Sequence, residues 1–158
     1  MITRTAEYAL RALLVLARGE SSRPLTADRL AEVTGTPRNY MSKTLYALAK
    51  GGLVQSTRGP AGGFALAKAP ESVSVADVTA IFAEPPRTQR CLLGTGACDP
   101  ARPCAAHHRW TRVRNAAQTA LSATTLADLL SDVTADDTPS DATLEYQRSG
   151  TAGAIQER

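Results

Sequence analysis

The chain has 158 residues, of which 43% are hydrophobic, and a formal net charge of +3. This length suits one domain with a hydrophobic core of its own, with room for an arm or a tail. No apolar run reaches the roughly 20 residues that a bilayer span needs, and the start of the chain lacks the order of a signal peptide. We therefore expect a cytoplasmic protein with no membrane partner.

The charges are unevenly distributed along the chain. Residues 1–70 carry ten Lys and Arg against four Asp and Glu, whereas residues 131–158 carry two against six. A basic N-terminal half predicts an anionic partner, and an acidic tail rich in Ser, Thr and Gly is typical of a disordered segment. We therefore expect a disordered acidic tail over residues 131–158.

Three helices are predicted in the N-terminal part. Apolar residues at helical spacing indicate an amphipathic helix from about residue 4 to residue 18. A second, short helix follows Thr26, a typical N-cap, and stops at Gly35. The third helix is expected to have Thr36 as its N-cap and Pro37 at its first position. Two short helices joined by a tight link predict a helix-turn-helix.

A hairpin is predicted directly after the third helix. Residues 53–57 and 64–68 have strand character, and the glycine-rich stretch between them contains Arg58. The glycines lead into an extended Phe-Ala-Leu stretch and not into Gly-Lys-Ser/Thr at a helix start, so we do not expect a nucleotide site. The hairpin is instead the predicted wing of a winged helix-turn-helix.

Two more helices are expected toward the C-terminus. One follows Ser74, a possible cap, and is expected to bury Val75, Val78, Ile81 and Phe82. A long helix is predicted from His107 to Leu130, and its narrow apolar seam suits pairing with another helix. The seam is formed by Trp110, Val113, Ala117, Ala120, Leu121 and Thr124.

The fold class is therefore mainly α, a winged helix-turn-helix with a two-stranded wing and a long C-terminal dimerisation helix. We assign residues 1–84 to the DNA-binding domain, 85–106 to a cysteine-rich loop, and 107–130 to the dimerisation helix. The third helix would enter the major groove, and the wing would reach the flanking backbone or the minor groove. The candidate DNA-binding residues are Thr36, Arg38, Asn39, Tyr40, Ser42, Lys43, Tyr46, Arg58, Gly59 and Gly62.

All three cysteines lie in one short window, which favours metal or redox chemistry over a disulfide framework. Cys91, Cys98 and Cys104 are followed after two residues by His107. Thiolates are soft ligands, so this set suits an iron-sulfur cluster or zinc. The fourth ligand is His107 or, as an alternative, Glu7, although Glu7 is also spaced for an ordinary helix ion pair with Arg11.

Two other classes of function are considered beside a metal-dependent DNA-binding regulator. One is a zinc-binding nucleic-acid-binding or adaptor protein, because Cys-Cys-Cys-His zinc fingers have a broadly similar order. The other is a redox enzyme or electron carrier, for which the chain lacks any substrate-pocket or second-cofactor motif. We expect no enzyme activity.

Several stretches together resemble the Rrf2 family of bacterial transcription regulators. They are TRTAEYALRALLVLA, TPRNYMSKTLYALAKGGLV, STRGPAGGFALAK, the three-cysteine loop with CAAHHRW, and TTLADLL. The resemblance covers about residues 1–131. It implies a winged-helix homodimer, paired through the long helix, that binds a roughly palindromic double-stranded DNA operator.

The resemblance also implies residue roles in an iron-sulfur site. Cys91, Cys98 and Cys104 match the cluster cysteines of the family, and His107 matches the histidine ligand of some members. Glu7 matches an acidic ligand that other members take from the partner subunit. By this resemblance, His107 as the fourth ligand would indicate a 2Fe-2S cluster, and Glu7 as the fourth ligand would indicate a 4Fe-4S cluster. The function implied is a regulator, most simply a repressor, that senses redox stress, nitric oxide or cluster status.

Overall fold

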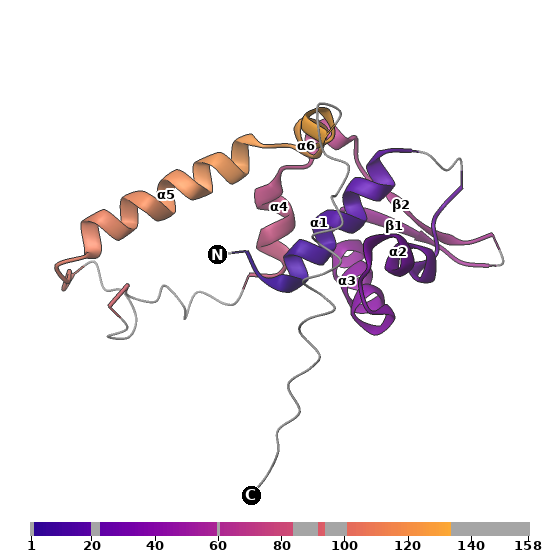
Figure 1. Ribbon diagram of the computed structural model, residues 1–158, viewed down its shortest axis with the longest axis horizontal. Coiled ribbons are helices and arrows are strands. Elements are labelled where there is room, and N and C mark those ends of the chain that lie inside the picture. The colour runs from indigo at the N-terminus through magenta and orange to yellow at the C-terminus, as the bar shows by residue number, and fades with distance from the viewer. Residues whose placement is uncertain (1, 20–22, 60, 84–91, 94–100, 134–158) are drawn as a thin grey trace, which may run out of the picture.

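Three helices form the N-terminal unit of the computed structural model: α1 (Arg4–Ala17), α2 (Ala27–Thr34) and α3 (Arg38–Lys50). The structure describes residues 2–19, 23–59, 61–83, 92–93 and 101–133. Figure 1 shows the two-stranded hairpin extending from one end of this unit and a long helix, α5 (His107–Ala123), projecting from the other. The three predicted helices are confirmed.

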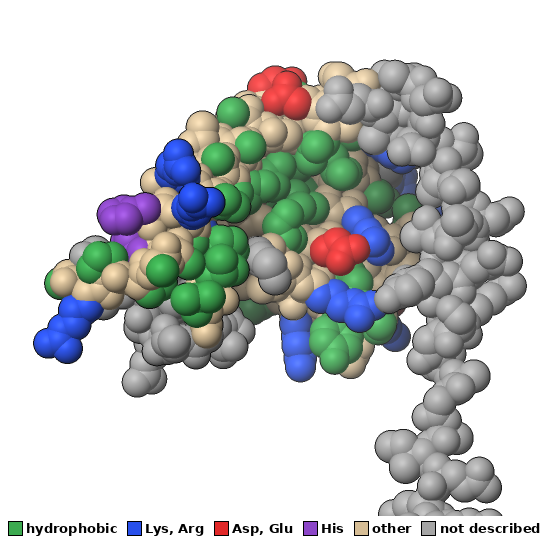
Figure 2. Space-filling model, turned by 60° about the vertical axis from the view of Figure 1, so that its left-hand side comes forward, with side chains coloured by type: hydrophobic (Ala, Val, Ile, Leu, Met, Phe, Trp, Pro, Cys, Tyr) green, Lys and Arg blue, Asp and Glu red, His purple; other side chains and the backbone are tan. Residues whose placement is uncertain are grey.

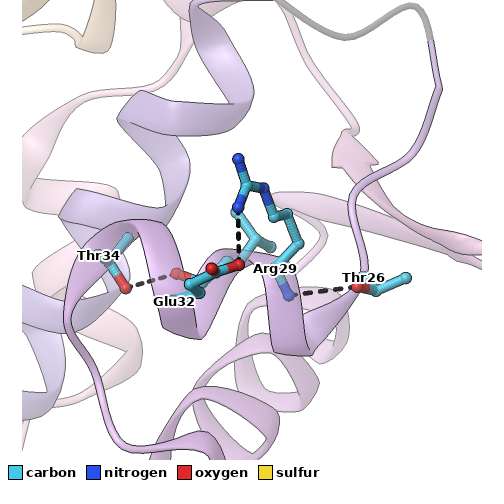
Figure 3. Close-up of polar contacts among 5 residues, drawn as sticks. Thr26, Arg29, Glu32 and Thr34 are labelled. Atoms are coloured by element: carbon cyan, nitrogen blue, oxygen red, sulfur yellow. Dashed lines mark hydrogen bonds and ion pairs between the residues drawn. The ribbon is translucent and has the colours of Figure 1, made fainter.

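Threonine side chains cap the N-termini of the first two helices. The Thr3 hydroxyl accepts a hydrogen bond from the Ala6 N–H at 3.2 Å, and the Thr26 hydroxyl accepts one from the Arg29 N–H at 3.2 Å (Figure 3). Each bond satisfies an N–H that has no partner within its helix. Helix α2 ends at Gly35, whose φ of 63° is readily reached only without a side chain. The predicted Thr26 cap and Gly35 stop are both confirmed.

The predicted start of α3 is wrong by one residue. Pro37, not Thr36, is the N-cap, and no side chain caps this end. Thr36 is buried, and its N–H donates to the Ala31 carbonyl at 3.0 Å. Its hydroxyl accepts from the Thr34 hydroxyl at 3.0 Å. Thr36 therefore belongs to the turn that closes α2, and its N–H is not available to an outside phosphate.

The predicted hairpin is confirmed. Strands β1 (Val54–Thr57) and β2 (Gly63–Leu66) are antiparallel, with Val54 opposite Leu66 and Thr57 opposite Gly63. An isolated bridge joins Leu25 to Phe64, through N–H to carbonyl bonds of 3.0 and 2.8 Å. The base of the wing is thereby fixed to the segment that enters α2.

A shared core holds these elements together. Met41, Leu45 and Leu48 of α3 are fully buried, as are Leu13 of α1 and Leu30 of α2. The same cluster includes Leu53 and Val54 at the start of the wing and Val73, Val78 and Leu126 from the C-terminal half. Burial of apolar area, at about 25 cal/mol per Å², is the main force that fixes α3 against α1 and α2.

The C-terminal half contains the 3-10 turn η1 (Pro70–Ser72) and helices α4 (Val75–Ile81), α5 (His107–Ala123) and α6 (Leu126–Val133). Ser74 caps α4 as predicted. Val75 and Val78 are buried, but Ile81 and Phe82 are only half-buried. None of the helices in the described ranges is long and apolar enough to span a membrane.

The prediction of one helix from His107 to Leu130 is wrong. Helix α5 stops at Ala123, because Thr124 is extended, with φ −92° and ψ 121°. The Thr124 carbonyl accepts from the Val75 N–H at 2.9 Å, and the Leu126 N–H donates to the Val73 carbonyl at 3.0 Å. This backbone pairing turns the chain so that Leu126 is fully buried in the core.

The predicted tail boundary at residue 131 is also displaced. Helix α6 continues to Val133, and the rest of the proposed tail lies outside the described residues. The cysteine-rich loop, residues 85–106, is likewise described only at residues 92–93 and 101–106.

Candidate nucleic-acid interface and metal ligands

Helix α3 has a buried face and an exposed polar face. The buried face, which packs against the core, contains Met41, Thr44, Leu45 and Leu48. Tyr46 on the opposite side is 74% exposed. The other exposed side chains are Arg38, Asn39, Tyr40, Ser42, Lys43 and Lys50. Hydrogen-bond donors and acceptors on one side of a helix, held by a core on the other, provide what major-groove reading requires.

Local hydrogen bonds orient several of these side chains. The Ser42 hydroxyl donates to the Arg38 carbonyl at 3.1 Å, so its oxygen still has capacity to accept. The Asn39 side-chain oxygen accepts from the Tyr40 N–H at 3.0 Å, which leaves the Asn39 amino group for an outside acceptor. The buried Thr44 hydroxyl donates to the Tyr40 carbonyl at 2.8 Å.

Two contacts tie the exposed face of α3 to the neighbouring helices. Arg38 forms an ion pair through its Nε with Oδ1 of Asp28 on α2. The ring of Tyr40 lies 6.5 Å from that of Tyr8 on α1, centroid to centroid. Sequence reasoning missed Asp28 and Tyr8, because both contacts cross between helices and no spacing along the chain reveals them.

The wing tip combines an exposed arginine with glycine-dependent backbone. Arg58 is exposed at the end of β1, and Gly59 has a φ of 110°, which residues with a side chain rarely adopt. The Gly62 N–H donates to the Gly59 carbonyl at 2.9 Å. A Cβ at Gly62 would lie 2.2 Å from the Thr57 carbonyl oxygen. Both predicted glycines therefore shape the tip that presents Arg58.

Only part of the predicted ligand set lies in the described residues. Cys104 is half-buried, and its carbonyl accepts from the His107 N–H at 2.9 Å, at the start of α5. The His107 and His108 rings are 5.4 Å apart in an edge-on arrangement. Cys91 and Cys98 lie outside the described residues. Within the described part, no three His, Cys, Asp or Glu side chains gather as a metal site.

Cys104 and His107, the two cysteine-loop candidates that lie in the described part, have donor atoms that suit an iron-sulfur cluster or zinc. Cys104 supplies a soft sulfur donor three residues before His107, the first residue of α5, which supplies an imidazole. Iron-sulfur clusters and zinc both accept this pair of donors. A thiolate and an imidazole at one helix start therefore fit either a cluster or zinc.

Glu7 is not brought to these ligands within one chain. Its Oε1 lies 2.5 Å from Nη2 of Arg11, the ion pair that its spacing predicted. In Figure 1, α5 begins at the tip of the projecting arm, away from α1. Among the described residues, Glu7, Cys104 and His107 do not gather as a metal site, so Glu7 of the same chain is not a third ligand beside the other two.

The three-helix unit, the wing that follows it and the polar face of α3 define a winged helix-turn-helix DNA-binding protein. Residues 2–132 match the Rrf2 family, which is described as iron-dependent transcriptional regulators, and the chain belongs to this family. The predicted family and fold class are thereby confirmed, apart from the length of the C-terminal helix.

Similar proteins support the same assignment. The chain is 34% identical over 128 residues to an HTH-type transcriptional regulator of Aquifex aeolicus, covering 80% of this chain and 88% of that protein. It is 30% identical over 131 residues to IscR of Escherichia coli, covering 83% and 80%. These relatives are regulators, so the prediction that the chain is not an enzyme is also confirmed.

Solved structures extend the likeness to three dimensions. CymR, the global cysteine regulator of B. subtilis, superposes with a TM-score of 0.69 at 26% identity, covering 83% of this chain and 96% of CymR. IscR of T. potens superposes with a TM-score of 0.68 at 25% identity, covering 84% and 88%.

Proposed function

We propose that the protein is a homodimeric repressor that binds a palindromic DNA operator under the control of an iron-sulfur cluster. The observation that carries the DNA-reading part is the exposed face of α3, held rigidly by a buried opposite face. In this proposal the exposed side chains of Asn39, Ser42, Lys43 and Tyr46 reach base edges, together with Arg38 at the helix start. Recognition helices of this class read with such residues in the major groove.

The wing supplies the second contact in this proposal. Arg58 would neutralise a phosphate or enter the flanking minor groove, and Gly59 and Gly62 let the tip backbone approach the duplex closely. Residues 1–70 carry most of the excess positive charge of the chain, which favours approach to DNA. Thr36 is excluded from this role as a side chain, because it is buried.

Dimerisation through α5 is proposed from the exposed side chains of its apolar seam. No residue of α5 is buried in the single chain, and Val113 is 58% exposed. Figure 2 shows hydrophobic side chains gathered across the middle of one face of the molecule. Exposed apolar surface of this kind typically marks a protein interface.

The cluster would be held by Cys91, Cys98 and Cys104, with His107 as the fourth ligand. His107 is favoured because its N–H donates to the Cys104 carbonyl, whereas Glu7 of the same chain does not gather with this pair and would have to come from a partner subunit. A cluster beside α5 would supply a sensor for redox stress, nitric oxide or cluster supply. The family description as iron-dependent and the similarity to IscR support this part of the proposal.

The test begins with protein purified without oxygen, whose iron, sulfide and zinc contents are then measured. We expect a coloured protein with iron and sulfide in equal amounts and no stoichiometric zinc. Selection from a random-sequence pool of duplexes should then yield a palindrome bound with strong salt dependence. Stoichiometric zinc without colour would refute the cluster, and failure to select any duplex would refute operator binding.

A further inference from the structure

An ion pair joins the two helices of the helix-turn-helix at the point where α3 begins. Arg38 is the first residue of α3, and Asp28 lies in the first turn of α2. The contact uses Nε of Arg38 and Oδ1 of Asp28. Both side chains are largely exposed, at 75% and 56%, so the pair lies on the surface beside the proposed reading face.

The contact between Arg38 and Asp28 is made through Nε of Arg38, not through a terminal amino group. A guanidinium has five N–H donors, and Nε supplies only one of them. The two terminal amino groups can still form the two parallel bonds to O6 and N7 of guanine, or to a phosphate. An exposed ion pair contributes little to folding. Its consequence is therefore the orientation of Arg38.

The arginine next to Asp28 on α2 forms its ion pair with another carboxylate. The adjacent Arg29 turns to Glu32, with 2.7 Å between its Nη1 and Oε2 of Glu32, as Figure 3 shows. Helix α2 thus carries two exposed carboxylates with different partners. Asp28 holds a residue of α3, whereas Glu32 holds a residue of α2 itself.

We propose that Asp28 is a positioning residue for sequence reading, which orients Arg38 so that its terminal amino groups meet base edges. The proposal rests on the proposed function, since it requires α3 to enter the major groove. Asp28 contacts no DNA in this scheme and acts only through Arg38. An oriented arginine loses less side-chain freedom on binding than a mobile one.

The effect that the proposal predicts for loss of Asp28 differs from the effect expected from charge alone. Removal of a carboxylate near DNA should strengthen binding to every duplex, because it removes repulsion from phosphates. Loss of a positioning residue should instead lower the preference for the right sequence. Glu32→Ala is the matched control, because it removes the same charge from the same helix without touching Arg38.

The experiment measures the affinity ratio between a duplex selected by the wild-type chain and a scrambled duplex of equal composition. We expect Arg38→Ala to lower this ratio about fivefold or more, as loss of a two-bond arginine-guanine contact requires. Asp28→Ala should lower it about threefold or more, and the double variant should be no worse than Arg38→Ala. Asp28→Asn keeps an oxygen that can accept from Nε and should recover part of the ratio.

The outcomes separate this proposal from the proposed function. If Asp28→Ala and Glu32→Ala both tighten binding equally and leave the ratio unchanged, Asp28 does not position Arg38. The same conclusion follows if the effects of Asp28→Ala and Arg38→Ala simply add. A wild-type chain that selects no duplex at all would instead overturn the proposed function. Circular dichroism of each variant confirms that a change in the ratio does not reflect unfolding.

Discussion

Ser74 and Thr125 face each other across an isolated antiparallel bridge, and each caps the helix that follows it. The Ser74 hydroxyl accepts from the Asp77 N–H at 3.1 Å, and the Ser74 N–H donates to the Asp77 carboxylate at 3.0 Å. Thr125 and Asp128 repeat both bonds, at 3.1 and 2.8 Å. The starts of α4 and α6 are therefore fixed to each other.

Loss of the Ser74 cap should destabilise the fold measurably. Ser74→Ala removes the hydroxyl that satisfies the Asp77 N–H, and we expect the free energy of unfolding to fall by about 1 kcal/mol. Urea denaturation followed by circular dichroism measures this change. Ser122→Ala, at an exposed serine inside α5 that caps no helix, is the control and should not lower the midpoint by a comparable amount. An equal midpoint for both variants would show that the cap contributes nothing.

The two capping carboxylates should make the fold sensitive to acid. Hydrogen bonds from Ser74, helped by Lys68, lower the pKa of Asp77, and hydrogen bonds from Thr125 lower the pKa of Asp128. A group whose pKa is lower in the folded state stabilises the fold above its unfolded pKa, near 3.8. That stabilisation is lost as the pH falls through the lower, folded pKa.

Urea midpoints measured from neutral pH downward test this effect. The wild-type midpoint should decline as the pH passes below 3.8, the ordinary pKa of aspartate. Asp77→Asn with Asp128→Asn should start from a lower midpoint and decline less over the same interval. Parallel curves for the two proteins would contradict a role of these carboxylates.

Arg58 at the wing tip is expected to contribute affinity without sequence preference. Arg58→Ala should weaken binding to selected and scrambled duplexes alike, and it should reduce the slope of log affinity against log salt by about one. Lys68→Ala removes the same charge beyond the base of the hairpin and should have a smaller effect. An unchanged salt slope for Arg58→Ala would mean that Arg58 makes no phosphate contact.

The proposed dimer should depend on one side of α5. Val113→Glu places a charge on the exposed apolar seam, so sedimentation should show a monomer where the wild type is a dimer. Asn115→Glu places the same charge about 200° around the helix and should remain dimeric. Both variants sedimenting like the wild type would argue against pairing through α5.

Local signals were sufficient to predict most elements of the fold. Thr26 and Gly35 act within one turn of their own helix, so the bounds of α2 were readable from the sequence. The wing was readable because its glycines and alternating strands are also local. The prediction of Thr36 as the N-cap of α3 was wrong because threonine is a common N-cap residue, whereas here Thr36 is buried in the turn that closes α2.

The long-range contacts could not be predicted in the same way. The break at Thr124 depends on pairing with Val73 and Val75, about 50 residues away in the chain. The Asp28 contact that orients Arg38 depends on the angle between α2 and α3, which the core sets. The spacing of the proposed ligands Cys104 and His107 can be read directly from the sequence, but the finding that Glu7 does not gather with them in one chain required the fold.

The central claim, that a cluster controls operator binding, is tested by one comparison. Anaerobic, coloured protein is assayed on the selected duplex before and after the metal is removed with a chelator, with dimerisation monitored in both samples. We predict that the affinity for the selected duplex changes by at least about fivefold, while the affinity for a scrambled duplex changes little. Equal affinity of the two forms for the selected duplex would contradict the account.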